Sequence, residues 1–261
     1  MKPSPLLLAA VLAGLAVALP AADPPGGTSL RVLCYNIHHG EGTDGKIDLP
    51  RQARVIADAK PDLVALQEVD NRCRRSGKVD QIAELARLTG LHGRFGKQID
   101  FEGGEYGQAV LSRFPLDELT VHWLPGKPDR ERRIAVEARV KVGGGEVSFV
   151  GTHLHHQRGD FREQQAAKLN ELFGKAERPV VLAGDLNAEP DAEPLDVLRE
   201  KWTVATARRS LLTYPAVKPA AQIDYVLCRP GKRFRVVEAK VIDETVASDH
   251  RPVLAVVELV P

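Results

Sequence analysis

Cysteine and aromatic residues are scarce in this 261-residue sequence, and neither sign of charge is in clear excess. Only three cysteines are present, and an odd number does not make a disulfide framework. The sequence also lacks a CxxC motif and the Cys/His spacings of zinc-binding modules. Because Cys34 and Cys228 lie in apolar runs, we expect buried thiols rather than disulfide partners or metal ligands.

The near-equality of the two charge signs limits the classes of binding partner. The chain has 36 basic and 35 acidic residues, and only two tryptophans. A tight, general nucleic-acid-binding protein carries a broad positive field, which this composition excludes. Weak or local contact with a nucleic acid stays compatible with it.

The N-terminal apolar run is too short to span a membrane. It extends from Leu6 to Leu19, 14 residues, and lies between Lys2 and the small residues of Pro20-Ala21-Ala22. This arrangement is typical of a secretory signal, so we expect residues 1–22 to be a signal peptide and the protein to be secreted or periplasmic. An uncleaved anchor or a disordered start is the alternative. The segment has no cysteine for lipoprotein attachment.

The rest of the chain is interpreted as one domain. Residues 23–29 are rich in proline and glycine and are expected to form a linker, which leaves residues 30–261 for the domain. Removal of residues 1–22 takes Lys2 away and leaves 35 basic and 35 acidic residues. A domain of this length can bury a substantial core.

Apolar periodicity predicts more strands than helices. The expected strands are Leu30 to Tyr35, Leu63 to Leu66, Ala109 to Ser112, Ile134 to Val142, Val147 to His153, Val180 to Ala183, Ile223 to Cys228, Val236 to Ile242 and Val253 to Val260. The expected helices are Asp48 to Ala59, Asp80 to Leu88 and Arg162 to Phe173. Hairpins therefore mix with helical crossovers, which favours sheets packed on each other with helices outside.

Six of these segments carry a polar residue at or near a strand end. The residues are Asn36, Glu68, His153, Asp185 with Asn187, Asp224, and Asp249 with His250. A single polar strand end is ordinary, but six with a consistent choice of carboxylate, amide and imidazole indicate a shared site. Oxygen and imidazole donors without any thiolate are typical of a magnesium or manganese site.

The segments that carry these residues resemble those of a known family. The runs YNIHHG, LQEVD, GTHL, GDLN, IDYVL and SDHRPV are similar, in order, to the signature segments of the endonuclease/exonuclease/phosphatase superfamily. The resemblance covers Leu30 to Leu259. It implies an α/β (α+β) fold like that of DNase I, a four-layer α-β-β-α sandwich of two mixed β-sheets flanked by helices.

The resemblance also implies a metal site of three residues. Glu68 is expected to bind the ion directly, Asn36 directly or through water, and Asp249 to complete the cluster. The expected cofactor is Mg²⁺, with Mn²⁺ as the alternative, since magnesium keeps several waters and needs few protein ligands. A helix cap or a surface ion pair is the alternative role for Glu68.

The catalytic roles implied by the resemblance fall on five residues. His250 is expected to be the general base for the attacking water or the group that steadies the transition state, with Asp224 holding it in position. Asp185 is expected to orient or deprotonate the water, and Asn187 and His153 to donate to phosphate oxygens. A buried acid that caps a turn is the alternative for Asp224.

Some residues depart from the pattern of the family. His38 stands where several nucleases of the superfamily have an acid, His155 and His156 follow the GTHL run, and Gln108 replaces a more familiar Asn. The extra histidines either shift the metal preference toward manganese or a transition metal, or are solvated. Arg133 is a candidate phosphate-binding residue, with a solvated charge run as the alternative.

The expected function is that of an exported, Mg²⁺-dependent phosphodiesterase in which water attacks phosphorus in line, without a covalent intermediate. The substrate is a phosphoester: a nucleic acid, a phospholipid head group or a small molecule. No stable protein partner is implied, and a monomer is expected.

Four alternatives have distinct requirements. An endonuclease on DNA or RNA needs a basic groove. A sphingomyelinase-like enzyme needs an exposed apolar loop. The candidate loop is Leu119 to Pro125 with Trp123, and the alternative is that Trp123 lies in the core. A sugar or inositol phosphatase needs clustered Lys and Arg. A non-catalytic binding relative would have lost the residues at Glu68, Asp185 or His250, and all three are present.

Overall fold

A computed structural model describes residues 28–117, 119–127, 131–207 and 211–260. The expected signal peptide lies outside these residues and stays a prediction. Strand β1 starts at Thr28, so Thr28 and Ser29 belong to the domain and not to the linker. None of the helices in the described part of the chain is both long enough and apolar enough to cross a membrane.

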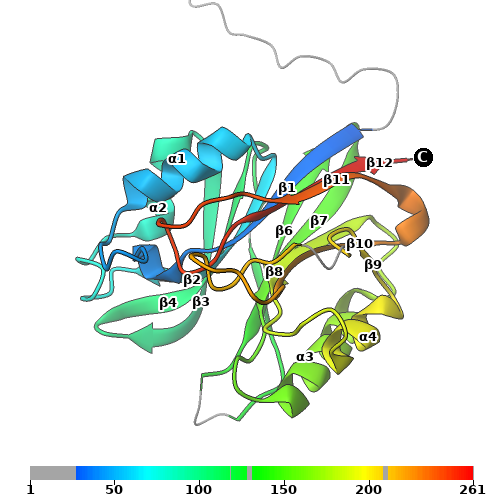
Figure 1. Ribbon diagram of the computed structural model, residues 1–261. Coiled ribbons are helices and arrows are strands. Elements are labelled where there is room, and N and C mark those ends of the chain that lie inside the picture. Colours follow the sequence, from blue (N-terminus) through cyan, green and yellow to red (C-terminus); the bar gives the residue numbers. More distant parts are fainter. Residues whose placement is uncertain (1–27, 118, 128–130, 208–210, 261) are drawn as a thin grey trace, which may run out of the picture.

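The described residues form two six-stranded mixed sheets (Figure 1). The first has the order β11-β12-β1-β2-β4-β3, with strands Phe234–Val241, Val253–Leu259, Thr28–Asn36, Leu63–Asn71, Gly104–Ser112 and His92–Phe101. The second has the order β5-β6-β7-β8-β10-β9, with strands Thr120–Trp123, Ile134–Val142, Gly145–His153, Val180–Asp185, Asp224–Arg229 and Thr203–Val204.

The two sheets pack face to face, and helices cover their outer faces. Alternating residues of both sheets, such as Val32, Val136 and Val226, form the core between them. Helices α1 (Leu49–Ala59) and α2 (Gln81–Thr89) pack on the outer face of the first sheet. Helices α3 (Gly159–Phe173) and α4 (Glu193–Arg199) pack on the second (Figure 1). The predicted four-layer sandwich is confirmed.

Each sheet contains one parallel pair, and these pairs determine where polar residues meet. Strands β1 and β2 are parallel and are joined through α1; strands β7 and β8 are parallel and are joined through α3. The carboxyl ends of β1 and β2 therefore lie at one edge of their sheet, and those of β7 and β8 at one edge of theirs. Strands β10 and β12 run antiparallel to β8 and β1, so they begin at these same edges.

The predicted helices are found, with differences at their ends. The side chains of Asp48 and Asp80 accept hydrogen bonds from Arg51 N and Ala83 N, as N-caps do. Helix α3 starts at Gly159, before the expected Arg162. Strands β3, β5 and β9 and helix α4 were not predicted. Strand β3 is half exposed along its length, so its sequence shows no apolar alternation.

The three thiols are free and buried, as expected for Cys34 and Cys228. Burial raises the pKa of Cys34 well above its usual value and that of Cys73 to about 11. Because the thiolate is the reactive form, native protein at pH 8 should react with a thiol reagent ~100-fold more slowly than unfolded protein. Absorbance of released thionitrobenzoate measures both rates. Rapid modification of one thiol per native chain would show an accessible cysteine.

Candidate active site

The polar residues singled out in the sequence converge at one end of the sandwich. Asn36 ends β1, His153 ends β7 and Asp185 ends β8. Asp224 begins β10, where it pairs in register with Asp185. His250 lies just before β12. The parallel pairs and their antiparallel neighbours thus bring residues that are far apart in the sequence to one site.

A β-bulge redirects Glu68 within strand β2. The register between β2 and β4 shifts between Leu66 and Val69, so Gln67 and Glu68 interrupt the regular ladder. Glu68 has a φ of 59°, a left-handed conformation that few residues other than glycine adopt. Gln67 is fully buried, whereas the Glu68 side chain stays partly accessible. The bulge therefore presents the Glu68 carboxylate to the site.

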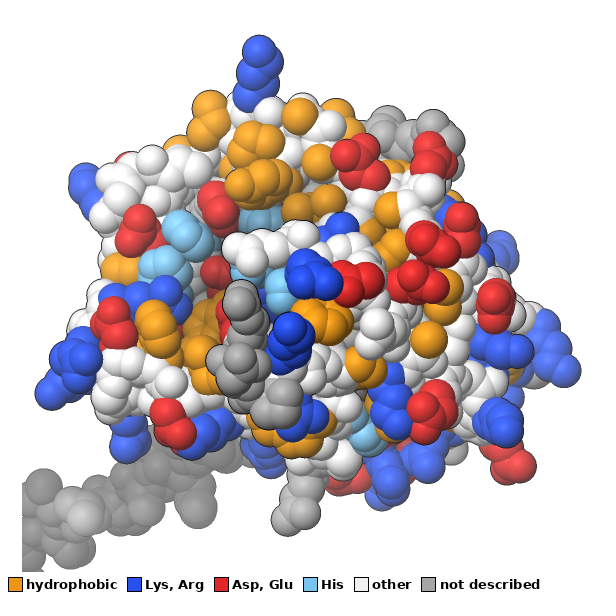
Figure 2. All heavy atoms as spheres, turned by 90° about the horizontal axis from the view of Figure 1, so that it is seen from below, with side chains coloured by type: hydrophobic (Ala, Val, Ile, Leu, Met, Phe, Trp, Pro, Cys, Tyr) orange, Lys and Arg blue, Asp and Glu red, His pale blue; other side chains and the backbone are white. Residues whose placement is uncertain are grey.

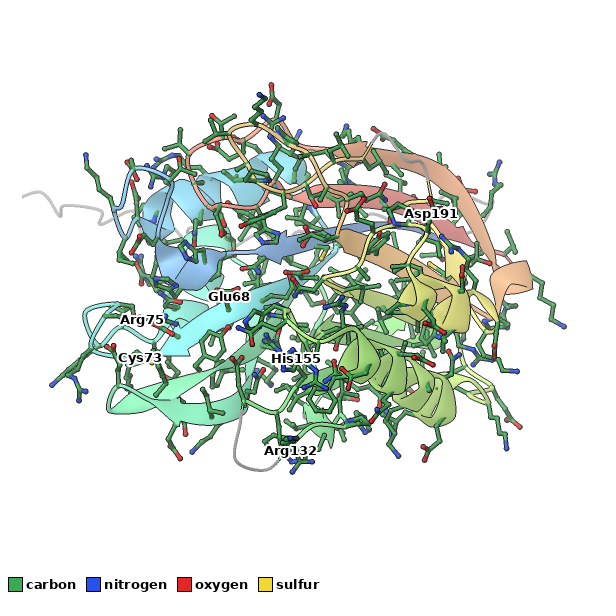
Figure 3. All side chains as sticks on the ribbon, turned by 60° about the horizontal axis from the view of Figure 1, so that its bottom comes forward. Glu68, Cys73, Arg75, Arg132, His155 and Asp191 are labelled. Carbon is green, nitrogen blue, oxygen red and sulfur yellow. The ribbon has the colours of Figure 1, made fainter. Side chains whose placement is uncertain are left out.

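A polar cavity of about 370 Å³ opens at this end of the sandwich. Its lining residues are Glu68, Tyr106, Glu131, Arg133, His153, His156, Asp185, Asn187, Tyr214, Ile223, Asp249 and His250. Histidine and acidic side chains gather on the face shown in Figure 2. In Figure 3, Glu68 comes from the first sheet, and His155 follows β7 of the second. Seven of the nine predicted site residues line the cavity; Asn36 and Asp224 contact the lining from behind.

Asn36 connects the two sheets at the cavity. Its amide nitrogen donates to Glu68 Oε1 at 3.1 Å and to Asp185 Oδ2 at 3.2 Å. Its amide oxygen accepts a hydrogen bond from the backbone N–H of His38 at 3.0 Å. Ser248 donates to the Asn36 carbonyl at 2.7 Å and so fixes the loop that carries Asp249. Asn36 is 1% exposed, so these contacts form in the interior.

His250 lies between two buried carboxylates. Its Nδ1 is 2.9 Å from Asp224 Oδ2, and its Nε2 is 3.8 Å from Asp185 Oδ2. Burial alone would lower the pKa of His250, but the carboxylates of Asp224 and Asp185 outweigh it and raise the pKa to about 10. Burial raises the pKa of Asp185 to about 7, and the Asp224 carboxylate adds to this rise. The protonated His250 imidazole and the Asp185 carboxylate therefore stabilise each other's charged form.

The guanidinium of Arg133 lines the cavity and binds two histidines. Its Nη1 is 3.2 Å from His153 Nδ1, and its Nη2 is 3.1 Å from His156 Nδ1. A guanidinium only donates, so Nδ1 of His153 is an acceptor and its proton lies on Nε2. That Nε2 has the Asp185 Oδ2 acceptor 3.4 Å away, while the neighbouring Asn187 amide nitrogen, at 2.9 Å, donates to the Leu154 carbonyl. The geometry thus gives His153 a donor directed at the cavity.

A chain of buried amides fixes Arg133 in turn. Gln108 donates to Gln98 at 3.1 Å, and Gln98 donates to Glu131 at 2.8 Å. Glu131 Oε1 lies 2.9 Å from Arg133 Nη1. The Gln108 amide, noted as a departure from the family pattern, therefore supports the position of His153 from the first sheet. Arg133 is 2% exposed, which rules out the solvated charge run for this residue.

Several site residues carried no signal in the sequence. Tyr106 lies in β4 and lines the cavity, and the Tyr214 ring packs against His250 with centroids 4.8 Å apart. Glu131 stands in a charged run that gave no indication of burial. These residues reach the site through the pairing of β4 with β2 and through a loop before β10. These residues could have been found from the sequence only if that strand pairing had been known.

The proposed apolar loop at Leu119 to Pro125 is mostly a strand. Residues Thr120–Trp123 form β5, which pairs with β6, and Leu124 is fully buried. Trp123 is 45% exposed and is therefore not a core residue. Its ring stacks under the Arg132 guanidinium at 4.7 Å. A single tryptophan on an edge strand is not the apolar loop that a bilayer-binding enzyme needs.

Comparison with known proteins gives a consistent result. A model of the endonuclease/exonuclease/phosphatase family matches residues 33–250. A solved structure from Beutenbergia cavernae, described as an endonuclease/exonuclease/phosphatase, has a TM-score of 0.71 and 28% identity, covering 89% of this chain and 72% of that chain. A mannosyl-6-phosphatase from Bacteroides thetaiotaomicron has a TM-score of 0.72 and 20% identity, covering 89% and 100%.

One curated relative is much longer than the aligned region. Protein cwh43 of Schizosaccharomyces pombe is 28% identical over 165 residues, which is 63% of this chain. The chain spans 17% of the length of that protein. The similarity therefore concerns one region of cwh43.

His153 should stay neutral at pH values where an ordinary histidine is charged. Burial lowers the pKa of His153 well below its usual value, and the Arg133 guanidinium lowers it further. The unfolded chain binds a proton near pH 6.5 that folded His153 does not, so its contribution to stability falls as pH drops below about 6.5. Long-range ¹H–¹⁵N spectra, assigned with His153→Gln, should show a neutral ring protonated on Nε2 at pH 6. A charged ring there would contradict this arrangement.

Proposed function

The chain belongs to the endonuclease/exonuclease/phosphatase family, whose members hydrolyse phosphoesters, and on this premise we propose that it is a magnesium-dependent phosphodiesterase. The observation that carries the proposal is that carboxylates able to bind a metal ion and groups able to transfer a proton lie at one cavity. Glu68 and Asp249 offer carboxylate oxygens, while Asp185 and His250 form a proton-holding pair. Asn36 holds Glu68 and Asp185 together.

The residues at the cavity fit a hard divalent cation. Glu68 and Asp249 both line the cavity, and Asn36 contacts Glu68 from behind. These are oxygen donors, and Mg²⁺ is bound in proteins by one or two carboxylates plus waters and substrate oxygens. Glu68 and Asp249 would hold the ion, with Asn36 reaching it directly or through water. A bound Mg²⁺ supplies Lewis-acid stabilisation of the charge on the phosphoryl oxygens.

Asp185 and His250 activate the attacking water in this proposal. The 3.8 Å between Asp185 Oδ2 and His250 Nε2 allows one water oxygen to contact both groups. The water attacks phosphorus as the ester P–O bond on the opposite side breaks, and its proton passes to the Asp185 carboxylate, because His250 already carries a proton. Asp224 keeps the imidazole in the required orientation through Nδ1. No covalent bond to the protein forms.

Three donors face the developing charge from the second sheet. His153 carries its proton on Nε2, and Asn187 lies 2.9 Å from that nitrogen. Asn187 has a φ of 48°, and its backbone N–H donates to Asp185 Oδ1 at 2.9 Å, so its position is fixed. Arg133 adds positive charge behind His153. Preorganised donors of this kind stabilise a transition state without reorganisation during the reaction.

A second candidate function is hydrolysis of a small sugar phosphate. The cavity of about 370 Å³ is polar and near the lower end of the range for small-molecule sites, and Arg133 and His156 line one wall. The mannosyl-6-phosphatase from Bacteroides thetaiotaomicron shares the fold. A phosphomonoester would place its free oxygens against this wall. The two candidates differ in the ester that is cleaved, not in the catalytic residues.

Hydrolysis of bis-p-nitrophenyl phosphate tests the proposal. We expect turnover with Mg²⁺ or Mn²⁺ and none with EDTA. His250→Ala and Asp224→Asn should each lower kcat by about 10²- to 10⁴-fold, since they remove or misorient the proton-transfer group. The measurement is p-nitrophenolate release, with p-nitrophenyl phosphate and mannose 6-phosphate compared in parallel.

His92→Gln is the matched control for these variants. His92 is exposed and pairs in register with Ser112, at the end of β4 away from Tyr106, so its loss should leave kcat unchanged. Faster cleavage of the two monoesters than of the diester would select the second candidate. If folded wild-type protein hydrolyses none of the three substrates with either ion, the catalytic proposal for phosphoesters of this size fails.

Export is proposed from the N-terminal sequence alone. The run Leu6 to Leu19 with Lys2 before it and Pro20-Ala21-Ala22 after it has the pattern of a secretory signal. Full-length chain made in a Gram-negative host should appear in the periplasmic fraction with its mass reduced by residues 1–22. Fractionation followed by N-terminal sequencing measures both. Full-length protein that stays with the cytoplasm or the inner membrane would contradict export.

A further inference from the structure

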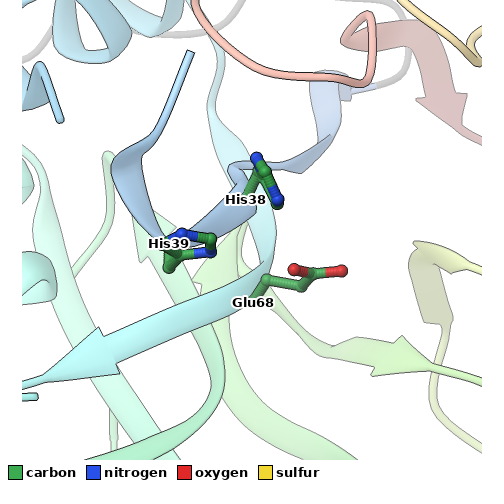
Figure 4. A group of neighbouring side chains, drawn as sticks. All are labelled: His38, His39 and Glu68. Atoms are coloured by element: carbon green, nitrogen blue, oxygen red, sulfur yellow. The ribbon is translucent and has the colours of Figure 1, made fainter. Parts of the chain in front are cut away.

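Two adjacent histidines form an unusual turn beside Glu68. His38 and His39 belong to the short 3₁₀ segment His38–Gly40, and both have a φ of 44°. Glu68 is itself left-handed, so three non-glycine residues with positive φ gather at one place (Figure 4). Such a conformation is strained and persists only where its surroundings fix it, and such strain concentrates at functional sites.

Buried glutamines from both outer helices hold this turn in place. Gln52 of α1 donates to the Ile37 carbonyl at 2.8 Å, and Gln81 of α2 donates to the His39 carbonyl at 2.7 Å. Both glutamines are fully buried. The backbone on either side of His38 is therefore fixed by two glutamines that also bind the Ala247 carbonyl and the Asp70 N–H. This support is what a preorganised site requires.

Each imidazole lies beside Glu68 and has a ring nitrogen without a partner. Nδ1 of His38 and Nδ1 of His39 are buried, and neither has a hydrogen-bond partner among the described residues. The two rings meet edge to face with centroids 4.4 Å apart. One donor atom from each histidine and one from Glu68 lie within 4.8 Å of one another. A buried ring nitrogen without a protein partner can be satisfied by water or by an ion.

Glu41 gives His39 the orientation of a metal ligand. Its Oε2 lies 3.6 Å from His39 Nε2, on the side of the ring away from the unpartnered Nδ1. A carboxylate that faces one ring nitrogen favours the proton there and leaves the lone pair on the other. This carboxylate–histidine arrangement recurs behind metal-binding histidines.

We propose that His38, His39 and Glu68 form a binding site for a borderline transition-metal ion, of which Zn²⁺ is the representative. Two imidazoles and one glutamate are a known zinc donor set, with a further position left for water. The site adds imidazole nitrogen to Glu68, whereas the proposed magnesium site adds the oxygens of Asp249. Zinc binding at this turn does not require the proposed reaction.

The charges around the turn are compatible with a cation. Arg75 is the nearby positive group, and its guanidinium makes two hydrogen bonds, of 2.9 Å and 2.8 Å, to the buried carboxylate of Asp70. That pair is neutral overall, so the carboxylates of Glu41 and Glu68 set the local charge. The other His/acid group, Asp185 with Asp224 and His250, has its ring nitrogens facing carboxylates of the group itself. The His38–His39 turn is therefore the better site for an additional ion.

Equilibrium binding of Zn²⁺ to EDTA-treated, dialysed protein tests the proposal without substrate. Competition with a chromophoric chelator should give one tight Zn²⁺ per chain, and Co²⁺ should give intense visible bands from nitrogen coordination. His38→Gln and His39→Gln should each weaken Zn²⁺ binding more than Glu41→Gln, for which about 10-fold is expected because it removes only the support for His39. The readout is the competition constant, with thermal unfolding as the check on folding.

Matched variants separate this site from the other histidines. His92→Gln should leave the Zn²⁺ constant unchanged. Equal Zn²⁺ affinity in wild type, His38→Gln and His39→Gln would overturn the proposal, as would a loss seen only in His250→Gln or His156→Gln. Because the titration contains no phosphoester, failure of the turnover assay and failure of zinc binding are distinguishable.

Discussion

The hydrogen bonds of Asn36 are the interaction on which the site depends. One amide group contacts Glu68 of the first sheet and Asp185 of the second, and it is buried. These are charged acceptors, for which a hydrogen bond contributes more than between neutral groups. Without this amide, two carboxylates would face each other across the sheet interface with no donor between them. Asn36 thereby fixes the carboxylates of both sheets at the cavity.

Carboxylates outnumber the positively charged groups at the cavity. Five acids, Glu68, Glu131, Asp185, Asp224 and Asp249, lie at or just behind the cavity, and like charges at short range destabilise one another. His250 balances Asp224 and Asp185 by carrying a proton. The carboxylates of Glu68 and Asp249 have no comparable basic partner in the cavity lining, since Arg133 is bound to histidines. This imbalance is the electrostatic reason to expect a divalent ion there.

The sequence was sufficient for residues whose position follows from a strand end. Asn36, His153 and Asp185 end apolar runs, so the chain itself shows where they lie, and the family resemblance then related the sheets. The bulge at Glu68 and the burial of Arg133 could not be predicted in this way. Both depend on pairing between strands far apart in the sequence, which sets register and burial but leaves no local pattern.

Glu68 stands between two sets of donors, and this position connects the two proposals. Its Oε1 is held by Asn36, and the unpartnered imidazole nitrogens of His38 and His39 lie on the side of the 3₁₀ turn. Oxygen donors select hard ions, whereas imidazoles favour borderline ones, so the two proposals assign this one carboxylate to two classes of cation. An acid at position 38 would remove this distinction by making both sides oxygen-rich. We therefore expect His38, two positions after Asn36, to decide whether a borderline ion binds beside Glu68.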